Sequence, residues 1–194
     1  MNRLLFLTGN TGKLEEARHF FAPLGYEVQQ FLIDGEVPKV VEPQADNLRF
    51  VTQSKIEQAL DFLGTTEQRS AVLVEDAGLF IDELNGFPGV NSATILEQIG
   101  LSGVLNIMRG MNNRGAEFRA CAAIWDGDQV FFGEGICRGE ITEDVRGGGG
   151  FGYDPIFSPT EEGTERTFAE MTLAEKSKYS HRKNALISLK NQLE

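Results

Sequence analysis

The stretch LLFLTGNTGKLEEARHFF, residues 4–21, decides how the chain begins to fold. Its apolar start predicts a strand, a glycine-broken turn ends at Lys13, and the residues after it predict a helix. Peptide N–H groups at a helix start have no intrahelical partner and carry the positive end of the helix dipole. This strand, turn and helix therefore predict an anion site, with phosphate as the natural ligand.

The turn matches neither of two common phosphate-binding patterns. A Walker A loop needs Gly, four residues and then Gly-Lys-Ser/Thr, whereas residues 9–14 read GNTGKL, and Leu14 cannot ligate magnesium. The dinucleotide pattern G-x-G-x-x-G is absent as well. What remains is a compact turn with peptide N–H groups, hydroxyls, an amide and an ammonium. From these residues alone, an ordinary strand-to-helix connection stays an open alternative.

The following residues continue an α/β pattern. Residues 71–76 (AVLVED) predict a strand that is buried on both faces, and residues 92–110 predict a helix. Residues 117–142 predict an antiparallel hairpin with its turn at Asp126-Gly127, so the sheet is expected to be mixed. An earlier helix, which ends at Gly64, is predicted by six apolar residues: Leu48, Val51, Ile56, Ala59, Leu60 and Leu63.

The C-terminal region predicts a helix start and then a break. Thr172 and Glu175 form a capping-box pattern, and Ser180 is placed to cap a further helix. That helix is expected to bury Ala185, Leu186, Leu189 and Leu193.

Composition limits the class of protein. With 194 residues, 41% of them apolar, and no repeat or linker, the chain predicts one globular domain over residues 1–194. No apolar run approaches the length of a membrane span or a signal-peptide core, so we expect no membrane association and a cytoplasmic protein. Cys121 and Cys137 do not face each other across the predicted hairpin, so no disulfide is expected.

Charge argues against a nucleic-acid polymer as partner. The formal net charge is −11, whereas a duplex binder needs a basic face that releases counterions. Residues 172–194, however, hold five Lys and Arg against two Glu. A basic segment on an acidic protein suits a small anionic ligand.

Two carboxylates, Glu75 and Asp76, are expected at the exit of the apolar strand 71–76. Ligands of α/β proteins bind beyond the carboxyl ends of strands, and hard oxygen ligands suit Mg²⁺. A solvated turn, with Glu75 paired to a surface lysine, is the alternative.

Two later stretches also offer ligand contacts. In RGGGGFGYDP, residues 146–155, four glycines indicate a backbone that approaches something closely or moves, and the aromatic rings offer stacking to a base. In EKSKYSHRKNAL, residues 175–186, a helix break at Ser180 would leave His181 and Arg182 at a helix start. For residues 146–155 the alternative is a flexible glycine loop with two aromatic side chains in the core. For residues 175–186 the alternative is a basic helix on the surface.

Four motifs in this order resemble the inosine triphosphate pyrophosphatase family, also called the Ham1 or non-standard purine NTP pyrophosphatase family. They are Thr-Gly-Asn-x-x-Lys from residue 8, Glu-Asp-x-Gly-Leu from 75, Gly-Phe-Gly-Tyr-Asp-Pro from 150 and Glu-Lys-x-x-x-Ser-His-Arg from 175. The resemblance implies a mixed central sheet with flanking helices that form two lobes around a nucleotide cleft. It also implies a homodimer and Mg²⁺-dependent hydrolysis of ITP, dITP and XTP to the monophosphate and pyrophosphate.

The resemblance implies site residues as well. Asp76 is implied as general base and metal ligand, and Glu42 as second metal ligand. Lys55, Ala77 and Lys176 are implied as substrate contacts. The triphosphate contacts would be Thr8, Gly9, Asn10, Thr11, Gly12 and Lys13, and the base pocket Phe151, Gly152, Tyr153, Asp154, His181 and Arg182. Gly148 and Gly149 depart from relatives, which often carry a small polar residue there.

Two other functions stay open. One is a related house-cleaning pyrophosphatase that acts on pyrimidine or modified nucleotides. The other is a nucleotide-binding regulator without turnover, which would not need a complete set of carboxylates.

Overall fold

The computed structural model describes residues 2–64, 70–163 and 165–193. These residues form two compact units. The first comprises Met1–Asp76, Cys121–Glu134 and Ala185–Glu194, and the second comprises Ala77–Ala120 and Gly135–Asn184. That the whole chain forms one domain stays a prediction.

The strands form a mixed sheet in the order β2-β1-β3-β5-β6-β7, with β4 paired to β3. β1 lies parallel to both β2 and β3, whereas β4 and β7 lie antiparallel to β3 and β6. The predicted mixed α/β class is therefore confirmed. The strands are β1 (Asn2–Phe6), β2 (Tyr26–Gln30), β3 (Ala71–Ile81), β4 (Pro88–Gly89), β5 (Gly115–Trp125), β6 (Val130–Ile141) and β7 (Phe157–Pro159).

Five α-helices accompany the strands in the described part of the chain: α1 (Thr11–Phe21), α2 (Leu48–Leu63), α3 (Ser92–Ile107), α4 (Leu173–Lys176) and α5 (His181–Leu193). α2 ends before Gly64 as predicted. α3 ends three residues earlier than expected and is interrupted at Gly100, whose φ of 65° is outside the helical range. Short 3₁₀ helices cover Ala22–Leu24, Asp82–Leu84, Asp154–Ile156, Thr160–Glu162 and Phe168–Glu170.

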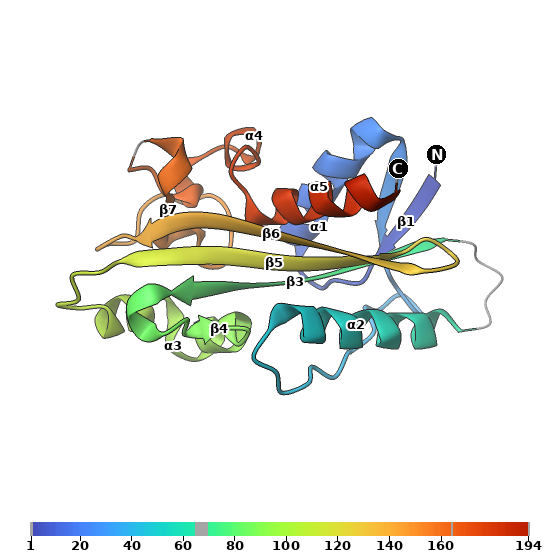
Figure 1. Cartoon of the computed structure of the whole chain (residues 1–194), viewed down its shortest axis with the longest axis horizontal. Helices are drawn as coiled ribbons and strands as arrows, with labels where there is room; N and C mark the ends of the chain where they lie inside the picture. The colour runs from blue at the N-terminus through green and yellow to red at the C-terminus, as the bar shows by residue number, and fades with distance from the viewer. Residues whose placement is uncertain (1, 65–69, 164, 194) are drawn as a thin grey trace. The chain divides into compact units, whose positions relative to one another are not determined.

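The first unit has its own core between α2 and the strands. Ile56, Ala59 and Leu63 of α2 pack with apolar side chains of β1, β3 and β5. In Figure 1, α2 lies on one side of these strands, and α1 and α5 lie on the other. The amphipathic spacing read from residues 48–63 therefore reflects a real buried face.

The second unit is organised around aromatic rings. Phe118 of β5 packs against Phe157 at a centroid distance of 4.5 Å, and Phe168 joins the same cluster. Figure 1 shows α3 and α4 on opposite sides of the strands of this unit. Tyr153 is buried in this core, and its hydroxyl donates to the Ser92 carbonyl at 2.8 Å.

The predicted end of the strand at residue 76 is wrong, because β3 continues to Ile81. Glu75 and Asp76 consequently lie inside the strand and not at its exit. The alternative to a ligand site was a solvated turn at Asp-Ala-Gly, residues 76–78, but these residues lie in β3, and a Cβ on Gly78 would overlap the backbone of Gly89 on β4. The glycine thus serves close strand packing. The parallel pairing with β1 does end at Leu73, so both carboxylates lie just beyond the end of that neighbour.

The hairpin turn is displaced by one residue from its predicted place. The Asp126 N–H donates to the Gln129 carbonyl, and the Asp126 carboxylate accepts from the Asp128 and Gln129 N–H groups. Gly127 and Asp128 are therefore the central residues. This side-chain contact outweighs the preference of Asp-Gly for the central positions. Both cysteines are free and buried, as expected.

The C-terminal helices largely follow the sequence pattern. Thr172 and Glu175 form the predicted capping box of α4, and α5 begins after Ser180. The Ser180 carbonyl accepts from the Asn184 N–H at 3.0 Å, but among the described residues its hydroxyl makes no hydrogen bond, so the side chain does not cap α5 as predicted. Ala185, Leu186 and Leu189 are buried as predicted, and the Leu193 side chain lies outside what is described.

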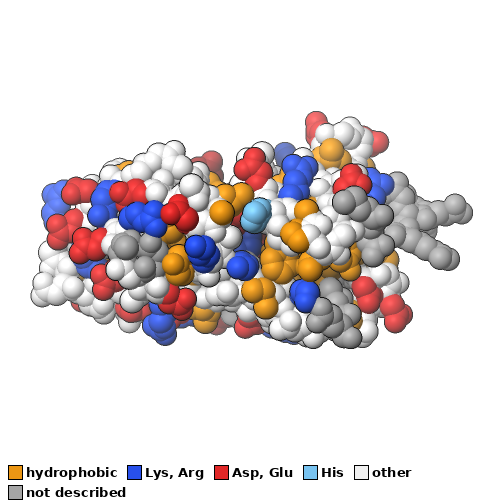
Figure 2. Space-filling view, turned by 90° about the horizontal axis from the view of Figure 1, so that it is seen from above, with side chains coloured by type: hydrophobic (Ala, Val, Ile, Leu, Met, Phe, Trp, Pro, Cys, Tyr) orange, Lys and Arg blue, Asp and Glu red, His pale blue; other side chains and the backbone are white. Residues whose placement is uncertain are grey.

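No helix in the described ranges is both long and apolar enough to cross a membrane. On the face drawn in Figure 2, basic and acidic side chains are interspersed.

Candidate active site

The turn between β1 and α1 is shaped by its own side chains. The Asn10 carboxamide oxygen accepts from the Lys13 N–H at 3.1 Å, and the Thr8 hydroxyl accepts from the Asn10 N–H at 3.1 Å. Gln30 of β2 donates to the Thr8 carbonyl at 2.7 Å. The predicted strand, turn and helix are confirmed, and the N–H groups of Thr11 and Gly12 lie in the first helical turn.

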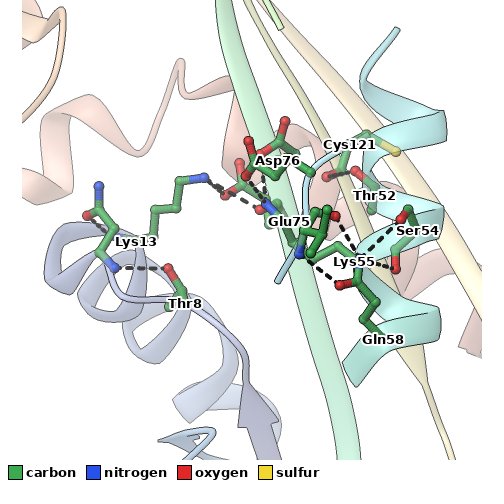
Figure 3. A network of polar contacts seen from close by, with 12 residues as sticks. Thr8, Lys13, Thr52, Ser54, Lys55, Gln58, Glu75, Asp76 and Cys121 are labelled. Atoms are coloured by element: carbon green, nitrogen blue, oxygen red, sulfur yellow. Dashed lines mark hydrogen bonds and ion pairs between the residues drawn. The ribbon is translucent and has the colours of Figure 1, made fainter. Parts of the chain in front are cut away.

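Lys13 points from this turn toward β3. Its ammonium lies 2.9 Å from Oε2 of Glu75, whose side chain is 1% exposed. Glu75 therefore pairs with Lys13 inside the protein, as Figure 3 shows, and not with a surface lysine. The buried carboxylate fixes the direction of the Lys13 side chain.

Lys55 of α2 joins two carboxylates. Its Nζ lies 3.0 Å from Oδ1 of Asp76 and 3.2 Å from Oε1 of Glu42. Burial disfavours the ammonium, but Asp76 and Glu42 raise the pKa of Lys55 overall. For Asp76, burial raises the pKa of the carboxyl, and Lys55 and Lys13 oppose this rise. Asp76 is therefore a carboxylate with enhanced basicity, the property that a general base requires.

Glu42 lies on a loop without regular secondary structure, and side chains of α2 bind this loop. The Gln58 carboxamide accepts from the Val41 N–H at 2.8 Å and donates to the Val41 carbonyl at 2.9 Å. Lys55 and Gln58 project from the same helix toward this region (Figure 3). The contacts bring Glu42 and Asp76 to one ammonium although they are far apart in sequence.

The carboxylates fit a hard divalent cation. Glu42 and Asp76 supply oxygen ligands, but within the described ranges no three His, Cys, Asp or Glu side chains are grouped to hold an ion. Mg²⁺ is commonly bound by one or two carboxylates, with water and substrate phosphates as its other ligands. The donor set is thus suited to an ion that arrives with a phosphorylated substrate.

The second unit places Phe151 beside two cations. The Lys176 ammonium lies 4.6 Å from the centre of the Phe151 ring, and the Arg182 guanidinium carbon lies 5.4 Å from it. Lys176 also lies 2.7 Å from Oδ2 of Asp154, an atom that accepts from the Phe151 N–H. Cation–π and ionic contacts therefore hold an aromatic ring and positive charge together.

His181 and Arg182 begin α5 and are both buried. The His181 ring stacks on Phe118 at a centroid distance of 4.6 Å and an interplanar angle of 11°. Because the ring packs flat on the core, its orientation is fixed. After the helix break predicted at Ser180, Arg182 lies beside Phe151 and His181 lies against Phe118.

Two of the consecutive glycines are required by packing. Gly147 has a φ of 80°, and its Cβ would lie 2.5 Å from the Ala169 carbonyl carbon. Gly150 has a φ of 68°, and its Cβ would overlap the Asp154 carboxylate. Close approach, the first of the two explanations offered by the sequence, therefore accounts for both glycines. Gly148 has no atom within 4 Å of its would-be Cβ.

The chain matches the Ham1 family model over residues 4–192. The chain belongs to the Ham1 family. The dITP/XTP pyrophosphatase of Thermococcus kodakarensis is 43% identical over 194 residues, covering 98% of this chain and 97% of that protein. The Methanopyrus kandleri protein of the same name is 42% identical, with 95% and 92% covered.

Solved Ham1 structures have the same fold. The Staphylococcus aureus Ham1 protein superposes with a TM-score of 0.80 at 26% identity, covering 99% of this chain and 98% of the other. A Coxiella burnetii HAM1 protein gives a TM-score of 0.79 at 28% identity, with 100% and 98% covered. The resemblance drawn from the four motifs is confirmed.

Two contacts of this Ham1 protein escaped the sequence analysis, namely those of Gln30 and Gln58. Both side chains bind the backbone of residues distant in the chain, Thr8 and Val41. Neither has a local signature. The position of Gln58 three residues after Lys55, on one helix face, was the only available signal.

Proposed function

We propose that this Ham1 protein is a nucleoside triphosphate pyrophosphatase that hydrolyses dITP, ITP and XTP to the monophosphate and pyrophosphate. The observation that carries the proposal is the buried Asp76, which Lys55 joins to Glu42 and which lies next to the Glu75–Lys13 pair. The names of its archaeal relatives, dITP/XTP pyrophosphatases, support dITP and XTP as substrates.

In this proposal Asp76 accepts the proton of the water that attacks the α-phosphorus. Its raised pKa favours proton acceptance. Mg²⁺ held by Glu42 and Asp76 would neutralise phosphate charge and lower the pKa of water. Lys55 keeps both carboxylates close together, and Lys13 adds positive charge near them. The bond broken is the one between the α-phosphorus and the bridging oxygen of the pyrophosphate.

The triphosphate is assigned to the turn Thr8–Lys13. A Cβ on Gly9 would meet no protein atom within 4 Å, so packing inside the protein does not require glycine there. A phosphate that approaches the backbone closely would require it. A phosphate there would be met by positive charge from the Lys13 ammonium and from the N–H groups of Thr11 and Gly12. Ala77, next to Asp76 on β3, remains a proposed substrate contact.

The base is assigned to Phe151–Asp154 with Lys176, His181 and Arg182. Phe151 offers a ring for stacking, which contributes about 1 to 3 kcal/mol per base. Donors of Arg182 and His181 would pair with a 6-oxo group, whereas the 6-amino group of adenine would leave them unpaired. Each unpaired buried donor costs about 1 to 3 kcal/mol, so two of them would give a selection of about a hundredfold or more.

Magnesium as the ion, the homodimer and the cytoplasmic location remain predictions from the resemblance and the composition. The carboxylate ligands favour magnesium over softer metals. Light scattering behind a sizing column would test the dimer.

Product analysis tests the function directly. The protein is incubated with Mg²⁺ and, separately, dITP, XTP, dGTP, dATP and dUTP, and products are separated by ion exchange. Monophosphate and pyrophosphate from dITP and XTP are expected. Diphosphate and phosphate would move the attack to the terminal phosphorus. Preferential turnover of dUTP would favour a pyrimidine enzyme, and nucleotide binding without product would favour the regulator.

A further inference from the structure

The backbone next to Glu42 is fixed by a side chain that has no part in the chemistry proposed above. Residues 37–45 have no regular secondary structure. The Glu42 side chain is 58% exposed, whereas that of Asp76 is 12% exposed. An exposed carboxylate on an irregular loop loses conformational freedom when it binds a metal. Whatever orders this loop beforehand therefore makes metal binding more favourable.

Gln58 binds both backbone groups of Val41, the residue that precedes Glu42. Its Oε1 accepts from the Val41 N–H at 2.8 Å, and its Nε2 donates to the Val41 carbonyl at 2.9 Å. The Nε2 group also lies 3.2 Å from both the carbonyl and the hydroxyl of Ser54. The reversed carboxamide would place Oε1 against two carbonyl oxygens, so these contacts select one orientation.

Three kinds of contact join the loop of residues 37–45 to α2. Val37 and Val40 pack against the apolar cluster that includes Ile56 and Ala59. The Gln58 amide holds the backbone, and the Lys55 ammonium holds the Glu42 carboxylate at 3.2 Å. Val41 itself is 77% exposed, so backbone hydrogen bonds and not burial fix this residue.

We propose that Gln58 is a positioning residue, which fixes the backbone at Val41 and so presents the Glu42 carboxylate for divalent-metal binding beside Asp76. The inference rests on the proposed function for the assignment of Glu42 as a metal ligand. A purely structural role would stabilise the loop without changing the affinity for metal.

Hydrogen exchange tests the hydrogen bonds themselves. In Gln58→Met, which keeps side-chain length and helix propensity but removes both bonds, peptides that contain the Val41 amide should exchange faster. Gln58→Glu retains an acceptor for that N–H but places its other carboxylate oxygen against the Val41 and Ser54 carbonyls, so it should keep only part of the protection. Gln53→Met is the matched control, since the exposed Gln53 on the same helix donates to Glu57 at 3.1 Å. Unchanged exchange in Gln58→Met would overturn the proposal.

Metal affinity tests the positioning. Mn²⁺ is titrated into protein saturated with the non-hydrolysable α,β-methylene analogue of dITP, and free Mn²⁺ is measured by electron paramagnetic resonance against a protein-free blank. Gln58→Met should weaken Mn²⁺ binding about tenfold, the usual effect of losing an outer partner of a metal ligand. Gln53→Met should change it by less than about twofold.

The same titration in a Glu42→Gln background shows whether Gln58 acts through Glu42. Adding Gln58→Met there should cause no further loss, because coupled residues are not additive. Wild-type Mn²⁺ affinity in Gln58→Met, or an equal loss in both backgrounds, would overturn the proposal. Product analysis of the wild-type protein tests the proposed pyrophosphatase activity separately from the positioning role of Gln58. Its result does not depend on the Mn²⁺ affinities of the variants.

Discussion

The Lys55 ammonium lies 3.0 Å from Oδ1 of Asp76, so a cation of α2 contacts the carboxylate that we propose as general base. Both residues are buried. The same ammonium reaches Glu42, so one side chain neutralises both proposed metal ligands. The site is therefore assembled around an internal cation, and the ligands need no metal to stay together.

Replacing Asp76 by Asn should abolish turnover of dITP while nucleotide binding remains measurable. The amide keeps the shape of the side chain but cannot accept the proton, and general-base catalysis contributes about 10²- to 10⁴-fold. The measurements are kcat and, separately, the affinity for α,β-methylene dITP by calorimetry. Asp61→Asn, at an exposed position of α2, is the control. Near-normal kcat in Asp76→Asn would remove this residue from catalysis.

Replacing Lys55 by Met should destabilise the protein at pH 8. The change leaves the buried Asp76 without the cation that contacts it, and breaking a buried ion pair costs about 3 to 5 kcal/mol. Without Lys55 the pKa of Asp76 rises further above its value in the unfolded protein. The loss of folding stability is therefore largest at high pH, where the buried carboxylate is ionised. It becomes smaller as the pH falls and the carboxyl takes up a proton.

Urea unfolding of wild type and Lys55→Met at pH 8 and pH 5 measures this effect. The difference between the two proteins should be larger at pH 8. Equal differences at both pH values would mean that Lys55 stabilises by packing and not by charge.

Replacing Arg182 by Ala should reduce the preference for 6-oxo purines more than it reduces phosphate binding. The guanidinium lies beside Phe151 in the second unit, where we place the base. Loss of a buried donor should lower kcat/KM for dITP about 10- to 100-fold. Inhibition by inorganic tripolyphosphate should change much less, and Lys183→Ala serves as the control. Equal losses for both compounds would contradict the assignment.

The sequence predicted those parts of the fold that local patterns determine. The turn at residues 8–13, helix α2 and the capping box at Thr172 each depend on neighbouring residues. β3 was cut short because Ala77 and Gly78 resemble a turn, whereas Gly78 is small to admit Gly89 from another segment. The pairing of Gln58 with Val41, across 17 positions, likewise depends on tertiary packing and leaves no local pattern.

Lowering the pH should weaken the start of α4 through Glu175. Hydrogen bonds from the Thr172 backbone N–H and hydroxyl, with help from Arg166, lower the pKa of this carboxyl to about 2 from 4.5. A carboxyl whose pKa is lower in the folded than in the unfolded protein stabilises the fold at pH values above its unfolded pKa. This stabilisation is lost as the pH falls from about 4.5 toward 2. In Glu175→Gln the fall in thermal midpoint between pH 5 and pH 3 should therefore be smaller than in wild type. Glu143→Gln, at an exposed position, should leave that fall unchanged.

Two neighbouring glycines should differ sharply in their tolerance of alanine. At Gly150, with φ of 68°, an added Cβ would overlap the Asp154 carboxylate, which binds the Phe151 N–H and Lys176. Gly150→Ala should lower the free energy of unfolding by about 2 to 3 kcal/mol, from backbone strain and the displaced carboxylate. At Gly148 no atom lies within 4 Å of the added Cβ, so Gly148→Ala should change stability by less than about 0.5 kcal/mol. Because the two changes are chemically identical and two residues apart, urea unfolding of both variants measures the combined cost of the positive φ and of the contact with Asp154 at position 150. If both variants unfolded at the same urea concentration, neither the positive φ nor that contact would restrict position 150.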